Sequence, residues 1–107
     1  MKLMTKALEK RFKQVGSQEK TATFDKIVIA KFFNPGGAGR WYAIEYDPEE
    51  KLFFGYVSIF GDWNDEWGYF TLEELEAIRG NLGLKIERDL YCGEQTIREH
   101  KINSMRV

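Results

Sequence analysis

The sequence has very few residues of the kinds that form disulfides, metal sites or membrane spans. Its 107 residues include one cysteine, Cys92, and one histidine, His100. Small secreted domains usually carry paired cysteines, so the single thiol favours a reducing compartment. No run approaches the roughly 20 apolar residues of a membrane-spanning helix, and the first residues are charged where a signal peptide would be apolar. We therefore expect a cytoplasmic protein with no membrane partner.

The residues that are present are sufficient for one folded core. The length lies in the usual range for a single domain, and 43% of the residues are hydrophobic. This apolar content is large enough to offset the chain entropy that keeps polar sequences unfolded. We expect a single domain over residues 1–107, in which residues 93–107 form a partly ordered tail because their periodicity is weak.

Charge is distributed unevenly along the chain, although the formal net charge is only −1. Residues 1–40 carry nine basic and three acidic side chains, whereas residues 41–107 carry seven basic and fourteen acidic ones. The span 45–76 alone holds ten acids and one base, Lys51. If folding keeps these groups apart, the acidic side would attract a basic protein and repel nucleic acid. A basic protein is therefore the expected partner, and nucleic acid is disfavoured.

Two segments have the apolar spacing and the end signals of amphipathic helices. The first repeats apolar residues every three or four positions, at Met4, Leu8, Phe12 and Val15. Thr5 can cap its N-terminus and Gly16 can end it. The second segment begins with a capping box formed by Thr71 and Glu74, and Gly80 suits its C-terminal end.

Four further segments have the composition of β-strands. They are residues 25–33, 40–47, 52–61 and 83–91. A short turn after Asp47 joins the second and third segments, and such a link implies antiparallel pairing. We expect an α+β fold: a four-stranded, mostly antiparallel sheet with an N-terminal helix and a second helix before the last strand, both packed on one face. Gly55 within the third segment predicts a bulge or a close approach of another ring.

Four strings of the sequence resemble the domain of unknown function 2958 family. They are KFFNPGG, WYAIEYDPEEKLFFGYV, EWGYFTLEELEAIRG and GLKIERDLY, and the resemblance extends over roughly residues 1–92. It implies a small single-domain protein of bacteria, plasmids, integrative elements and phages, and it implies no activity, cofactor or catalytic residue. By association, this mobile-element context suggests an accessory role in transfer or in blocking a host defence, such as a CRISPR nuclease or a restriction enzyme.

The loop GDWNDEWG, residues 61–68, is the most unusual feature, and it is more acidic and aromatic than the family pattern. Two tryptophans on a short polar loop are costly to leave in water, and exposed aromatic residues beside carboxylates are typical of protein interfaces. The candidate partner-binding residues are Asp62, Trp63, Asp65, Glu66, Trp67 and Glu73. In the alternative interpretation, one or both rings fold back onto the sheet.

The acids of the span 45–76 permit a more specific hypothesis. They could imitate the phosphates of a nucleic acid and occupy the basic groove of a nuclease. The alternative is an ordinary solvated surface of turn and helix residues. Imitation of phosphates requires that these carboxylates share one face of the folded protein.

An enzymatic hypothesis depends on acidic pairs in two strands. Glu45 and Asp47 share one face of the second strand, and Glu87 and Asp89 share one face of the last strand. If these strands are neighbours, four carboxylates could form a two-metal hydrolytic site. Salt bridges with nearby arginines such as Arg88 are the alternative. We favour a non-enzymatic protein and expect no catalytic residue, metal or cofactor.

Three weaker sites complete the sequence-based hypotheses. Cys92 and His100 could form a metal site or a nucleophilic pair, but the sequence supplies neither further soft ligands nor an orienting group. The glycine loop 36–39 with Arg40 could hold a phosphate, but a strand follows it in place of a helix. Sheet aromatics and the basic N-terminal helix could bind a single-stranded nucleic acid.

Overall fold

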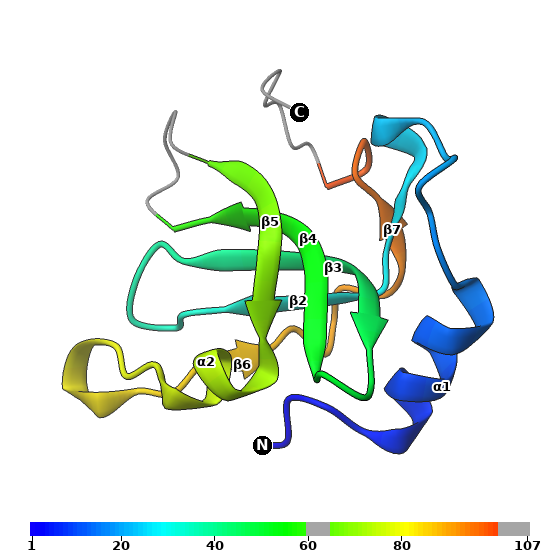
Figure 1. The fold of residues 1–107 in the computed structure, drawn as a ribbon. Coiled ribbons are helices and arrows are strands. Elements are labelled where there is room, and N and C mark those ends of the chain that lie inside the picture. Colours follow the sequence, from blue (N-terminus) through cyan, green and yellow to red (C-terminus); the bar gives the residue numbers. More distant parts are fainter. Residues whose placement is uncertain (60–64, 101–107) are drawn as a thin grey trace.

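The computed structural model describes residues 1–59 and 65–100. The elements in chain order are α1 Lys6–Val15, η1 Thr23–Asp25, β1 Ile27–Val28, β2 Ala30–Phe33, β3 Arg40–Asp47, β4 Leu52–Ser58, β5 Glu66–Thr71, α2 Leu72–Ala77, η2 Asn81–Gly83, β6 Glu87–Arg88 and β7 Gln95–Thr96 (Figure 1). The η elements are short 3₁₀ turns. The fold is therefore α+β, with one helix near the N-terminus and a second helix later in the chain, as the sequence predicts.

The main sheet contains five strands, and a second sheet contains two. The main sheet has the order β5-β4-β3-β2-β6, and β1 pairs with β7 in the small sheet. Every pair of neighbouring strands is antiparallel. The predicted number of four strands is wrong because β5 lies in a segment assigned to a loop and to the start of a helix. Its residues include Glu66 and Gly68, which both weaken a β-strand signal.

The first helix begins and ends where its sequence predicts. The Thr5 hydroxyl accepts a hydrogen bond from the Leu8 N–H at 3.1 Å, which satisfies one of the free donors of the first turn. Gly16 ends the helix with a φ of 67°, a left-handed value that favours glycine. Phe12 is the buried residue of α1, and its ring lies 5.9 Å from the ring of Phe53 on β4. Through this contact, α1 packs against the sheet.

The hairpin of β3 and β4 contains the irregularity that Gly55 predicts. The register of the two strands shifts between Ala43 and Glu45, which places a bulge in β3. Gly55 pairs with Ala43 just before this shift. The neighbour that approaches Gly55 is the backbone of Tyr42 and Ala43, and no aromatic ring is among its nearest atoms. The close approach is therefore between two backbones.

The strand β5 runs directly into α2. Thr71 ends β5 and caps the helix, because its hydroxyl accepts a hydrogen bond from the Glu74 N–H at 2.9 Å. The helix is shorter than the predicted segment 71–80, since the backbone is already extended at Ile78. Arg79 then forms an isolated antiparallel bridge with Lys85.

The last predicted strand, 83–91, is reduced to the two residues of β6. Alternation of apolar and polar residues predicts a strand with one buried face, but only Ile86 of that segment is buried. Leu84 and Leu90 are exposed. No packing partner covers them among the described residues, so most of the segment does not pair with β2.

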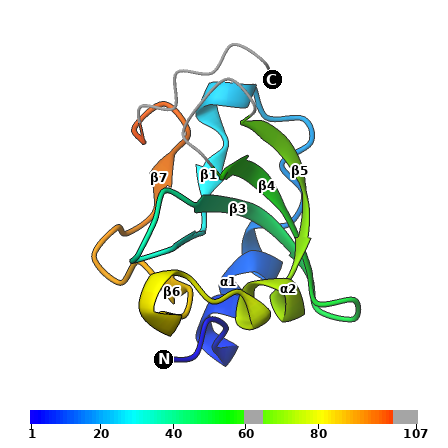
Figure 2. The same cartoon turned by 90° about the vertical axis from the view of Figure 1, so that its left-hand side faces the viewer.

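Two clusters of buried side chains lie on opposite faces of the main sheet. The larger cluster unites the helices with the sheet and contains Leu3, Phe12, Ile29, Ala30, Phe32, Trp41, Ala43, Phe53, Phe70, Leu75 and Ile86. The smaller cluster contains Val28, Ile44 and Ile97. Figure 2 shows α1 and α2 below the sheet and β7 beside its upper part. Both helices therefore pack on one face, and the opposite face is covered only in part.

Part of the segment expected as a tail belongs to the fold. Gln95 and Thr96 pair with Val28 and Ile27, and Ile97 has no exposed surface. Residues 101–107 of the expected tail lie outside the described residues. The sequence gives little sign of this strand because it has only two residues and both are polar.

Gln18 joins the segment after α1 to both sheets. Its side-chain amide donates hydrogen bonds to the carbonyl oxygens of Ile27 and Ile44, each at 2.9 Å. Its side-chain oxygen accepts a hydrogen bond from the Ile27 N–H at 2.6 Å. Its own backbone N–H donates to the carboxylate of Glu45 at 2.9 Å. This buried glutamine therefore satisfies backbone groups that would otherwise lack partners.

Candidate functional site

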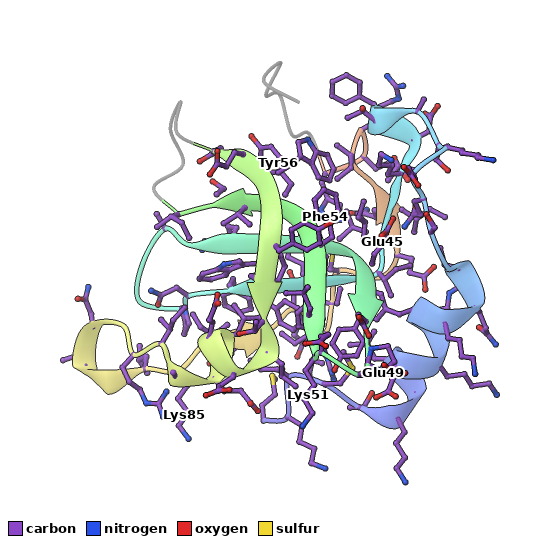
Figure 3. All side chains as sticks on the ribbon, in the orientation of Figure 1. Glu45, Glu49, Lys51, Phe54, Tyr56 and Lys85 are labelled. Carbon is purple, nitrogen blue, oxygen red and sulfur yellow. The ribbon has the colours of Figure 1, made fainter. Side chains whose placement is uncertain are left out.

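Five aromatic side chains form one contiguous cluster on the side of the sheet opposite the helices, where three of them pack in part against the smaller core cluster, and we call it the aromatic face. They are Tyr42 on β3, Phe54 and Tyr56 on β4, and Trp67 and Tyr69 on β5. The strand register places Tyr42, Tyr56 and Trp67 in one cross-strand row and Phe54 with Tyr69 in the next. Figure 3 shows Phe54 and Tyr56 along β4, with Glu45 of β3 nearby. Three neighbouring strands thus supply the face.

Ring contacts connect the whole aromatic face. The Phe54 ring stacks on Trp67 with centroids 5.9 Å apart and lies 4.9 Å from Tyr69. Tyr56 meets Trp67 edge-on at 5.6 Å and lies 6.3 Å from Tyr42. Tyr56 is buried, whereas 71% of the Tyr69 surface is exposed. Such contacts hold the rings in fixed positions, so the exposed Tyr69 projects from a rigid base.

The structure describes four of the six predicted partner-binding residues. Trp67 is half-buried against Phe54, which agrees in part with the alternative that the rings fold back onto the sheet. Asp65 precedes β5 and Glu66 begins it. Asp62 and Trp63 lie outside the described residues. The predicted site therefore contributes Asp65 and Trp67 to one end of the aromatic face, whereas Glu66, which pairs with Val57, alternates to the helix side of the sheet.

Two polar atoms at this end of the face are buried without a hydrogen-bond partner among the described residues. They are the Trp67 Nε1 donor and the Asp65 Oδ1 acceptor. Buried polar groups in folded proteins are almost always paired, and an unpaired one costs about 1–3 kcal/mol. Each unpaired group of this kind calls for an explanation, such as a functional role or a bound water.

The pKa of Tyr42 reflects burial and charge at the aromatic face. Burial raises the pKa of its phenol above the ordinary value, and the nearby Arg40 opposes this shift. Cys92, Asp65 and Tyr56 add smaller upward contributions. Tyr42 therefore keeps its proton at neutral pH, and the Asp65 carboxylate lies near enough to influence it.

The remaining predicted residue, Glu73, lies at the opposite end of β5. It is exposed on α2, beyond Thr71. The turn between β3 and β4 lies at this same end, because the Leu72 N–H donates to the Lys51 carbonyl at 3.0 Å. The acids of 45–76 that the structure describes, all but Asp62, thus separate into one group near Asp65 and others along β3, in its turn to β4 and on α2. They do not share one face, so we do not retain the imitation of phosphates.

A groove of about 950 Å³ lies between α1 and the β3–β4 hairpin. Three lysines of α1 line it, and Glu45, Asp47, Tyr46 and Tyr69 are among its other lining residues. The walls of the groove therefore carry both positive and negative side chains, so they favour neither an anionic nor a cationic ligand. Tyr69 belongs both to this groove and to the aromatic face, so the two surfaces are continuous.

The chain matches the family model described as a protein of unknown function, DUF2958, over residues 3–100. The chain belongs to the DUF2958 family. No curated protein and no solved structure shows a significant match to it. The DUF2958 match extends beyond the predicted resemblance over 1–92 and includes β7. It also contains every residue of the aromatic face.

The hydrolytic site proposed for this DUF2958 chain lacks the geometry that it requires. The hypothesis needs β3 and β6 as neighbours, but β2 lies between them. Glu87 pairs with Phe33, which faces Arg40 at the start of β3, whereas Asp47 ends that strand. Within residues 1–59 and 65–100, no three His, Cys, Asp or Glu side chains gather as a metal site. The two acidic pairs therefore do not converge.

Cys92 and His100 lie in contact in the DUF2958 fold, although no strong sign in the sequence predicts this contact. The Cys92 Sγ lies 3.5 Å from the His100 Nε2, and the imidazole meets Tyr42 edge-on at 5.2 Å. Burial raises the pKa of the Cys92 thiol, with Asp89 adding to the shift and Lys31 opposing it. Burial lowers the pKa of His100, and Lys31 lowers it further. Both groups are therefore neutral at pH 7, which is unlike an activated thiolate.

The glycine loop is closed by its own hydrogen bonds. The Arg40 Nη1 donates to the carbonyl oxygens of Gly37 and Gly39 at 3.1 and 2.8 Å. The Asn34 carboxamide oxygen accepts from the Gly36 N–H at 3.0 Å. Arg40 is thus engaged in shaping the loop, which agrees with a hairpin connection.

No helix among the described residues of this DUF2958 protein is long and apolar enough to cross a membrane.

Proposed function

We propose that this DUF2958 protein is a non-enzymatic interaction module that binds a basic protein through the aromatic face and the acids at its end. The observation that carries the proposal is the continuous contact of five rings on the helix-free side of the sheet, ending in the largely exposed Tyr69. Exposed aromatic residues on a rigid base are typical centres of protein interfaces.

The charges beside the face define the partner's chemistry. Asp65 and Glu66 lie where β5 begins, next to Trp67. Carboxylates at the edge of an interface select a partner with positive potential and accelerate its association. The partner is therefore a protein whose contacting surface is rich in lysine and arginine.

We further propose that the partner is a nuclease of a host defence system, either a CRISPR nuclease or a restriction enzyme. Nucleases of these systems present basic grooves to nucleic acid, which suits the acids beside the aromatic face. The mobile-element context of the family resemblance supports this choice by association. Binding in or beside such a groove would block access of the nucleic acid.

An affinity capture from host lysate tests the interaction. The wild-type domain is compared with Asp65→Lys/Glu66→Lys, and with Glu49→Lys/Glu50→Lys as a control that changes net charge equally at the other end of β5. We expect the first double variant to retain about tenfold less of a basic protein, equivalent to about 1.4 kcal/mol, and the control to retain it fully. Equal losses in both variants would show that net charge alone attracts the protein and would contradict the aromatic face.

Inhibition is tested separately with the captured nuclease. Cleavage of its nucleic-acid substrate is measured with increasing amounts of wild-type protein and of Tyr69→Ala. We expect the wild type to inhibit and the variant to need a higher concentration, because the variant lacks the most exposed ring of the face. Undiminished cleavage in the presence of bound protein would reject inhibition while leaving the interaction intact.

A single-stranded nucleic acid is the second candidate ligand. The Lys31 Nζ lies 5.5 Å from the centre of the Tyr42 ring, and the Arg40 guanidinium lies 5.8 Å from that of Phe33. Cations beside aromatic rings are a feature of surfaces on which bases stack. Mobility-shift measurements at low salt with a single-stranded oligonucleotide test this candidate, and an unshifted oligonucleotide would remove it.

A further inference from the structure

The strand β5 forms a free edge of the main sheet. It pairs with β4 on one side, and no strand within residues 1–59 and 65–100 pairs with its other side. The opposite edge, β6, has only two residues, whereas β5 has six. A long unpaired edge presents a row of N–H and C=O groups to any strand that can approach it.

The hydrogen bonds of the β4–β5 ladder identify which groups point outward. The Leu72 N–H donates to the Lys51 carbonyl, so the adjacent pair of Thr71 with Leu52 is not directly hydrogen-bonded. Backbone groups of an antiparallel strand alternate in direction at each residue. The N–H and C=O groups of Trp67 and Tyr69 therefore point away from β4. These two residues also supply rings to the aromatic face.

The usual protections of an edge strand are missing from β5. Natural proteins protect edges with lysine, proline, bulges or very short strands. The sequence EWGYFT contains neither lysine nor proline, and its register with β4 is unbroken. A Cβ placed on Gly68 at the centre of the strand would have no neighbour within 4 Å. No described side chain therefore crowds the middle of this strand on the helix side of the sheet.

The acidic side chains at the two ends of β5 determine which kind of strand could pair with its free edge. Glu66 begins the strand, and Glu73 and Glu74 follow its last residue. If two copies paired through β5 in parallel, Glu66 would face Glu66, and in antiparallel pairing it would face the acids of α2. Like charges directly opposite are unfavourable. An extended segment with lysine or arginine near its ends is complementary to the same edge.

We propose that β5 accepts an extended basic segment of the partner protein as a sixth strand of the main sheet. The segment would hydrogen-bond to the outward groups of Trp67 and Tyr69, and alternate side chains of the segment would lie against their rings. Backbone pairing supplies affinity in such strand addition, and the pockets for alternate side chains supply specificity. The proposal specifies the mode of binding for the partner described above and rests on that proposed function.

Amide hydrogen exchange of the wild-type protein tests the edge directly. The probes are a nine-residue peptide of alternating lysine and valine and its glutamate–valine counterpart. We expect the basic peptide alone to bind, and to slow exchange of the Trp67 and Tyr69 amides about tenfold or more. Exchange of the Gly68 amide, which points to β4, should change less. Failure of the basic peptide to bind, or binding without protection of the outward amides, would overturn the inference.

A matched pair of variants gives a second measurement. Tyr69→Ala removes the ring and keeps the outward N–H, whereas Tyr69→Pro removes both without breaking a bond to β4. We expect Tyr69→Pro to bind the basic peptide about tenfold more weakly than Tyr69→Ala. Equal affinities would overturn the inference. The proposed function would still stand if the captured protein depends on Asp65 and Glu66 in the charge-reversal test.

Discussion

The carbonyl oxygen of Tyr42 occupies the space into which a side chain on Gly55 would extend. A Cβ on Gly55 would clash with that oxygen. The Gly55 backbone is not in a left-handed conformation, so the requirement for glycine is steric. Its cross-strand partner Gly68 has no atom within 4 Å of the corresponding position. Two paired glycines in the same sheet therefore have opposite tolerance for a methyl group.

The substitution Gly55→Ala is expected to lower the free energy of unfolding by about 3 kcal/mol, because the backbone of the β3 bulge must shift to admit the methyl group. Gly68→Ala should change it by less than about 1 kcal/mol. Urea unfolding followed by tryptophan fluorescence measures both. Equal effects of the two substitutions would contradict the close approach of β3 and β4.

Gln18→Ala should lower the free energy of unfolding by about 3 kcal/mol. The substitution removes the partners of the Ile27 N–H and of the carbonyl oxygens of Ile27 and Ile44, and each unsatisfied buried group costs about 1–3 kcal/mol. Gln14→Ala makes the same chemical change at an exposed position of α1 and should have an effect within about 0.5 kcal/mol. A Gln18 variant as stable as the Gln14 variant would show that the bridge is not important for stability.

Ile97→Ala tests whether β7 contributes to the fold in solution. Ile97 is fully buried with Val28 and Ile44, so its truncation should cost about 3 kcal/mol. Leu90→Ala removes a comparable side chain at an exposed site and should cost less than about 1 kcal/mol. Thermal unfolding of the two variants gives the comparison. A small effect at Ile97 would return residues 93–100 to the status of a tail.

The Cys92 thiol should react slowly with iodoacetamide at neutral pH. Burial raises the pKa of this thiol, and only the thiolate is nucleophilic. We expect the midpoint of the alkylation rate against pH to lie higher in the folded protein than in the same protein unfolded in urea. A lower midpoint in the folded protein would mean that His100 stabilises the thiolate, as in a nucleophilic pair.

The low pKa of His100 predicts that folding stability falls as the solution becomes acidic. Below about pH 6.5, the ordinary value, the unfolded chain takes up a proton that the folded imidazole resists. The unfolded state then binds more protons, so stability decreases from there down to the folded pKa. His100→Gln should lose this part of the pH dependence when unfolding is measured between pH 8 and 5. Parallel curves for the two proteins would contradict a shifted His100.

The elements that were predictable from sequence have strong local signals. Thr5 and Gly16 specify the ends of α1, and the bounds of β3 match the predicted segment 40–47. The two helices were predictable because a cap and an apolar spacing act within a few residues of each other. The order of these elements along the chain followed from the same signals.

The elements that were missed depend on contacts with distant residues. The strand β5 carries Glu66 and Gly68, and its conformation is set by pairing with β4 along its whole length. The sequence drew attention to Trp67 through its unusual loop, but it did not reveal Tyr56 and Phe54 as the rings beneath it. Alternation along each strand could have indicated this row, since the side chains of Tyr42, Tyr56 and Trp67 point to the same side of the sheet. The cross-strand register that unites them is a property of the folded sheet.

The pairing of β1 with β7 also affects how the chain acquires its structure during synthesis. Ile27 is translated early, whereas its partner Thr96 is translated after all other described strands. The hairpin of β3 and β4 can form locally, but the cluster of Val28 and Ile44 stays incomplete until Ile97 has left the ribosome. Contacts so distant in sequence slow the final folding step. A nascent chain would therefore expose the apolar side chains of that cluster through most of its translation.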